Sequence, residues 1–196
     1  SLLDSHSKIL IMPALSFYRC WTILDLDKVK DKNMMYLRWL NYITQYVGPD
    51  CKNEQKKFLN SQEELNKFFF RLKECFESVV LNRNTVFFSI HESYAYAKSI
   101  DLKKIKILIS HETLPWYGDL IKKDFPNSKI LMVMRDPRAS LAGIWFRRRK
   151  IFGYLPDIVF TMTIECWMEG VKIMNDKFYT LNHNLYIIQN EKFNKD

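Results

Sequence analysis

Short apolar runs along the chain predict a set of buried strands. They lie at residues 8–12, 104–110 and 129–134, and a last strand is expected at residues 185–189. The run at residues 129–134 is continuously apolar, as expected of a strand that is buried on both faces of a parallel sheet.

The segments between these runs favour helices. Residues 17–47 follow a mostly helical, aromatic-rich pattern, and Ser61 begins a capping-box signature with Glu64. The apolar positions that follow recur every three or four residues, which predicts an amphipathic helix: Leu65, Phe68, Phe69, Leu72, Phe76 and Val79. Helices are also expected at residues 86–97, 137–150 and 156–177. Strands separated by helices imply an α/β fold with a mainly parallel sheet and right-handed crossovers.

The composition fits one ordinary globular domain. The chain has 196 residues, of which 47% are hydrophobic and 27% are charged. No apolar run approaches the ~20 residues that span a bilayer, so we expect no membrane span and a cytoplasmic protein. The four cysteines lack metal-site spacing, so no metal is expected: Cys20, Cys51, Cys75 and Cys166.

The formal net charge is +8, which favours anionic partners such as nucleic acid, anionic lipid, or phosphorylated and sulfated small molecules. An ordinary basic surface explains the charge equally well. Because the basic residues are scattered and match no nucleic-acid-binding motif, we predict no nucleic-acid partner.

The most informative segment is the end of the strand at residues 129–134. Arg135 follows the strand, Asp136 is placed to cap the next helix, and Pro137 suits its first position. Ligands bind at the carboxyl edge of open α/β sheets, and helix N-termini favour anions. The planar guanidinium of Arg135 could therefore hold a phosphate. Pairing of Arg135 with Asp136 or another carboxylate is an equally good reading of the local pattern.

The run FPNSKILMVMRDPRASLAG resembles the 3′-phosphate-binding segment of the PAPS-dependent sulfotransferase superfamily, especially its bacterial and carbohydrate-type members. The resemblance implies that Arg135 contacts the 3′-phosphate of 3′-phosphoadenosine 5′-phosphosulfate (PAPS), that 3′-phosphoadenosine 5′-phosphate (PAP) is the product, and that no metal takes part. The second phosphate ligand of the family is a serine eight residues after the arginine. Gly143 occupies that position here, and Ser140 is nearby on what we expect to be a different helix face.

Three other stretches support the resemblance. Residues 1–13 are similar to the helix and second strand that follow the family's phosphosulfate loop, and residues 106–121 resemble the segment before the arginine strand. Residues 186–193 resemble a diverged late strand in which Glu191 matches. The resemblance implies one domain of P-loop-NTPase-like, three-layer architecture. It also implies that the phosphosulfate loop and a cofactor-covering segment lie beyond the two ends, so that this piece is a weak or inactive enzyme.

The resemblance further implies in-line transfer of a sulfonate group to a hydroxyl or amine of a small-molecule or glycan acceptor. We favour His111 or Glu112 as the base that takes the acceptor proton, because both follow the strand at residues 104–110. Alternatively, His111 ties its loop to the core and Glu112 caps a helix. The basic run at residues 147–150 could contact the donor or an anionic acceptor, or could be a solvated helix end.

Two other functions remain open. Another P-loop enzyme, such as a kinase, requires an acidic magnesium ligand at a strand end, whereas the predicted strands end at His111 and Arg135. A degenerate, non-catalytic domain that binds nucleotides or anions is the second alternative.

Overall fold

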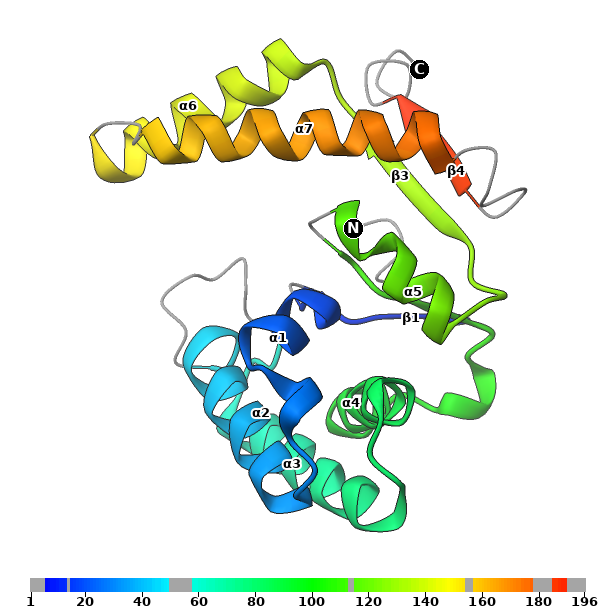
Figure 1. The fold of residues 1–196 in the computed structure, drawn as a ribbon. Coiled ribbons are helices and arrows are strands. Elements are labelled where there is room, and N and C mark those ends of the chain that lie inside the picture. The colour runs from blue at the N-terminus through cyan, green and yellow to red at the C-terminus, as the bar shows by residue number, and fades with distance from the viewer. Residues whose placement is uncertain are drawn as a thin grey trace. The chain divides into compact units, whose positions relative to one another are not determined.

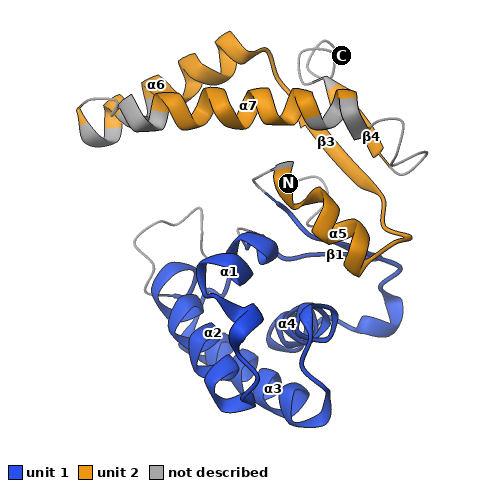
Figure 2. Cartoon of the chain, viewed as in Figure 1, with its two compact units in different colours: residues 1–113 blue, residues 114–196 orange. Residues whose placement is uncertain are grey.

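The computed structural model describes residues 6–13, 15–49, 58–112, 115–153, 157–177 and 185–189. The chain divides into two compact units, unit 1 at residues 1–113 and unit 2 at residues 114–196 (Figure 2). Most of the described residues are helical, and each unit contains one pair of strands (Figure 1). In the described ranges, no helix has the length and apolarity that a bilayer crossing requires.

Unit 1 contains the strands β1 and β2 and a group of helices. Its elements in chain order are β1 (Ile9–Ile11), α1 (Phe17–Ile23), the 3-10 helix η1 (Leu26–Lys28), α2 (Lys32–Tyr46), α3 (Gln62–Ser78), α4 (Arg83–Ala97), the 3-10 helix η3 (Leu102–Lys104) and β2 (Ile107–Ile109). β1 and β2 pair in parallel, with Ile9 opposite Ile107 and Ile11 opposite Ile109.

Unit 2 contains the second strand pair and two long helices, α6 and α7. Its elements are the 3-10 helix η4 (Pro115–Tyr117), α5 (Gly118–Asp124), β3 (Ile130–Met134), α6 (Pro137–Phe152), α7 (Asp157–Lys177) and β4 (Leu185–Gln189). β3 and β4 pair in parallel along their whole length, from Ile130 opposite Leu185 to Met134 opposite Gln189. α6 and α7 pack against each other.

The predicted α/β character and the parallel strand pairing are confirmed, but one expectation differs from the structure. We expected the strands at residues 104–110 and 129–134 to share one sheet, whereas β2 pairs with β1 and β3 pairs with β4 in two separate sheets. No three-layer central sheet is formed by the described residues. The start of the predicted strand also folds differently, because the Asp101 carboxylate accepts the Lys103 N–H at 3.0 Å and initiates η3.

The core of unit 1 forms where α3 and α4 pack together. Phe68, Leu72 and Phe76 of α3 are buried, as the three- and four-residue spacing predicts. Ser61 caps α3 by accepting the Glu64 N–H at 3.1 Å. The Glu64 carboxylate accepts the N–H of Asn60 at 2.6 Å, one residue earlier than in an ordinary capping box.

An aromatic cluster links α1 and α2 to α4. Phe17 of α1 stacks on Trp39 of α2 at 5.8 Å and meets Phe87 of α4 edge-on at 5.1 Å. These side chains are almost fully buried. The amino end of α1 is therefore held firmly against α2 and α4.

Candidate functional site

Arg135 connects β3 to α6 in unit 2, and its side chain is exposed. β3 pairs with β4 up to Met134, so Arg135 is the first residue beyond the parallel ladder. Within the described ranges, no hydrogen bond or ion pair engages its guanidinium. The five N–H donors of the group are thus available to an anion.

Asp136 caps α6, as predicted from the sequence. Its Oδ1 accepts the N–H groups of Arg138 at 2.8 Å and Ala139 at 3.4 Å, and its carbonyl accepts the N–H of Ser140 at 2.9 Å. Pro137 has no N–H to offer. The helix N-terminus is therefore already satisfied by Asp136, so an anion beside Arg135 cannot rely on the free N–H groups that we expected there.

Asp136 pairs with Arg138 rather than with Arg135. The Arg138 guanidinium donates to Oδ1 through Nε at 3.1 Å and to Oδ2 through Nη2 at 2.7 Å. These hydrogen bonds hold the pKa of Asp136 down to about 2. The described residues show no hydrogen bond or ion pair between the Arg135 guanidinium and Asp136, so the pairing of these two side chains is not found.

Gly143 lies beside the Arg135 guanidinium. A Cβ added at Gly143 would meet one atom within 4 Å, the Nη1 of Arg135 at 3.6 Å, which is ordinary contact. The position eight residues after Arg135 therefore faces the guanidinium. Ser140 precedes Gly143 by three residues in α6, and side chains three apart are neighbours on a helix.

The Arg135 backbone is held by α7. Nε1 of Trp167 donates a hydrogen bond to the Arg135 carbonyl at 3.3 Å, across 32 residues of sequence. The spacing gives no sequence signal for this contact, because it depends on how α7 packs on α6.

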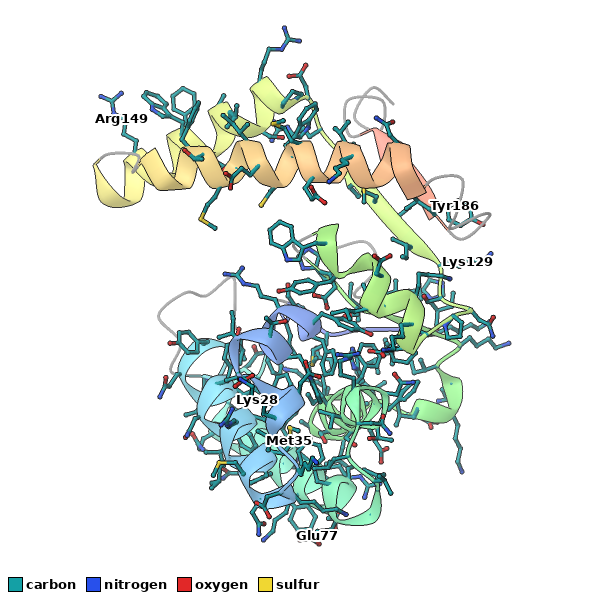
Figure 3. All side chains as sticks on the ribbon, viewed as in Figure 1. Lys28, Met35, Glu77, Lys129, Arg149 and Tyr186 are labelled. Carbon is teal, nitrogen blue, oxygen red and sulfur yellow. The ribbon has the colours of Figure 1, made fainter. Side chains whose placement is uncertain are left out.

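A cation lies over an aromatic ring near each end of the segment formed by β3 and α6. At the start of β3, Nζ of Lys129 lies 3.4 Å from the Tyr186 hydroxyl and 5.6 Å from the centre of its ring (Figure 3). Towards the other end, Arg149 of the predicted basic run lies over Trp145, 5.0 Å from its ring centre. Arg149 is thus packed on an aromatic neighbour, as an exposed helix residue can be.

His111 and Glu112 follow β2 in unit 1, and their environments differ. The His111 side chain is exposed, whereas Glu112 is largely buried. Oε1 of Glu112 accepts the N–H of Tyr18, in the first turn of α1, at 3.3 Å, and the Ser110 hydroxyl at 3.2 Å. Glu112 thus caps α1 from 94 residues away, while Ser16, the residue before that helix, makes no side-chain cap bond.

Burial raises the pKa of Glu112 to about 7, and the hydrogen bonds from Tyr18 and Ser110 offset only part of that rise. Oε2 is buried and has no hydrogen-bond partner among the described residues. A carboxyl group in this state exchanges its proton near neutral pH. Glu112 is therefore both a helix cap and a carboxyl group whose pKa is raised by burial.

No family model, curated protein or solved structure matches the chain. Among the described residues, no group of three or more histidine, cysteine or acidic side chains is arranged to hold a metal ion.

Proposed function

We propose that this protein is a PAPS-dependent sulfotransferase and that Arg135 holds the 3′-phosphate of the donor. The observation that carries the proposal is the exposed Arg135 guanidinium, which no described residue pairs with. It lies at the carboxyl end of a parallel strand, beside the position where the resembling family places its second phosphate ligand. Asp136 does not compete for Arg135, because it is bound to Arg138.

The residues at the site fit a phosphate group, although few of them can donate a hydrogen bond to it. Arg135 can donate two parallel hydrogen bonds to phosphate oxygens, and Ser140 supplies a hydroxyl on the neighbouring helix position. Gly143 supplies no side chain, and Asp136 occupies the helix N–H groups. The affinity for the 3′-phosphate should therefore come chiefly from Arg135, with Ser140 as the second contact.

PAPS supplies the sulfonate group, and PAP is the product. The acceptor oxygen or nitrogen of a small molecule or glycan forms the new bond to sulfur as the bond to the phosphate oxygen breaks, and its proton passes to a base. We propose His111 or Glu112 as that base. Glu112 has a suitable acidity for this role, because a base with a pKa near 7 is half ionised at neutral pH and still binds a proton strongly.

We also propose that the whole protein has the P-loop-NTPase-like fold of such a sulfotransferase, with one central, mainly parallel sheet. The two parallel pairs and the strand–Asp–Pro–helix junction at Arg135 support it, since both are features of such folds.

Calorimetric titration of the protein with PAP, adenosine 5′-phosphate and Mg²⁺–ATP tests the proposal. PAP and adenosine 5′-phosphate share the adenosine 5′-phosphate group, so only the 3′-phosphate of PAP distinguishes them. A charge-assisted contact contributes about 1.5–3 kcal/mol, and with Gly143 at the second position we expect the lower half, roughly a ten- to fortyfold preference for PAP. Equal affinity for PAP and adenosine 5′-phosphate contradicts the proposal. Tightest binding of Mg²⁺–ATP would instead favour a kinase-like enzyme.

A further inference from the structure

The structure assigns a positioning role to Trp167: its indole N–H fixes the Arg135 backbone so that the guanidinium stays beside Gly143, where the donor 3′-phosphate would bind. The inference rests on the proposed function for its ligand, but the contact itself is independent of any ligand. Nε1 of Trp167 lies 3.3 Å from the Arg135 carbonyl oxygen.

The Arg135 carbonyl is the acceptor at which the chain turns from strand to helix. It lies beyond the last paired residues of the β3–β4 ladder, Met134 and Gln189. It also lies before the first helical residue of α6, Pro137. The indole N–H of Trp167 donates to this carbonyl, and no other donor to the carbonyl is found in the described part of the chain. Without Trp167 the carbonyl would therefore depend on solvent for a hydrogen bond.

The hydrogen bond restrains the peptide that joins Arg135 to Asp136. The orientation of that peptide sets the direction in which α6 leaves the strand, and α6 carries Gly143 against Nη1 of Arg135. Trp167 belongs to α7, which packs along α6. The same helix pair therefore supports both sides of the contact between the guanidinium and position 143.

Trp167 acts through Arg135, so its loss should change the nucleotide preference more than the stability. Trp167→Phe keeps an aromatic ring and removes the N–H. A neutral hydrogen bond of this kind corresponds to about a two- to tenfold effect, so PAP should bind two- to tenfold more weakly while adenosine 5′-phosphate binds as before. Trp145→Phe is the matched control, because Trp145 is also a partly exposed tryptophan of unit 2 but does not contact the Arg135 carbonyl.

A measurement on the wild-type protein tests the contact without any substitution. In NMR spectra, the indole proton of Trp167 should exchange with solvent more slowly than that of Trp145. The Nε–H group of Arg135 should become more mobile in Trp167→Phe, while that of Arg149 stays unchanged. Equal exchange of the two indoles, or unchanged Arg135 mobility in the variant, overturns the inference.

The nucleotide titrations separate this inference from the proposed function. If Trp167→Phe loosens Arg135 but the wild type does not prefer PAP, the positioning role stands and the sulfotransferase proposal fails. If the wild type prefers PAP and Trp167→Phe weakens both nucleotides equally, the tryptophan is merely structural and the inference fails.

Discussion

The pKa values of buried groups in unit 1 and of Asp136 in unit 2 are shifted by different causes. At three groups inside unit 1 burial is the chief cause: it raises the pKa of Glu112 to about 7 and that of the Cys20 thiol to about 12, and it lowers the pKa of His91 to about 4. In unit 2 a hydrogen-bonded pair is shifted: Arg138 lowers the pKa of the half-buried Asp136 carboxylate, and Asp136 raises the pKa of Arg138. Burial thus controls the acidity of Glu112 in unit 1, whereas hydrogen bonding controls that of Asp136 in unit 2.

The difference follows from how much apolar surface each unit buries. Nearly all buried apolar side chains belong to unit 1, whereas in the described part of unit 2 only Tyr117 and Leu185 are buried. In the same described part of unit 2, the exposed large apolar residues are Trp116, Leu131, Val133, Trp145, Phe146, Phe160, Met162, Met168, Tyr186 and Ile187. Stability should therefore depend on unit 1 and ligand recognition on unit 2.

The sharpest contrast is between two identical truncations. Leu72 of α3 is fully buried, and Leu131 of β3 is 58% exposed. Leu72→Ala should lower the free energy of unfolding by about 2–5 kcal/mol, because it removes core contacts and leaves a cavity. Leu131→Ala should change it by less than about 0.5 kcal/mol. Denaturant unfolding measures both, and equal losses in the two variants would remove the distinction between the units.

The buried carboxyl group of unit 1 should make stability depend on pH. Its pKa rises from 4.5 to about 7 on folding, so between these values the folded state binds the extra proton. Stability should therefore decrease as the pH rises from 4.5 to 7, by about 3 kcal/mol. Glu112→Gln should remove this dependence. The stability of the variant relative to the wild type should therefore be higher at pH 8 than at pH 5.

His91 acts in the opposite direction, so the comparison must be between variant and wild type. Its pKa falls from 6.5 to about 4 on folding, and stability is lost as the pH drops through that range. Subtracting the wild-type curve from that of Glu112→Gln cancels the His91 contribution. A flat difference between pH 4.5 and 7 would show that Glu112 is ionised normally in the folded protein.

The smallest expected effect is at Gly143. Gly143→Ala and Gly143→Ser each add a Cβ that meets only Arg135, and both should stabilise α6 by about 0.5–1 kcal/mol by removing a helical glycine. Only the serine adds a hydroxyl beside the guanidinium, so it should bind PAP more tightly than the alanine variant by about 0.5–1.5 kcal/mol. Calorimetry on the pair isolates the hydroxyl. Identical PAP affinities would place the 3′-phosphate away from this face of α6.

Much of the secondary structure follows from local pattern. The Asp136 cap, Pro137 at the first helical position, and the strand at residues 185–189 all appear where the sequence predicts them. These features depend on a few neighbouring residues, whose propensities and side-chain bonds act within one turn.

The contacts that complete the candidate site could not be predicted in this way. Glu112 caps a helix 94 residues away, and Trp167 reaches Arg135 across 32 residues. Both depend on tertiary packing, which no spacing rule encodes. By contrast, the sequence could have predicted that Asp136 occupies the first N–H groups of α6, because a residue that caps a helix accepts hydrogen bonds from them.

The most direct test of the central claim is the ratio of PAP to adenosine 5′-phosphate affinity in wild type, Arg135→Ala and Lys172→Ala. Lys172 is an exposed cation of the same unit, 67% accessible and weakly paired with Glu169 at 3.8 Å, so it controls for the loss of one positive charge. We predict that Arg135→Ala reduces the preference for PAP at least tenfold without lowering the melting temperature, and that Lys172→Ala leaves it within about twofold. A PAP preference that survives in Arg135→Ala would show that Arg135 does not hold the 3′-phosphate.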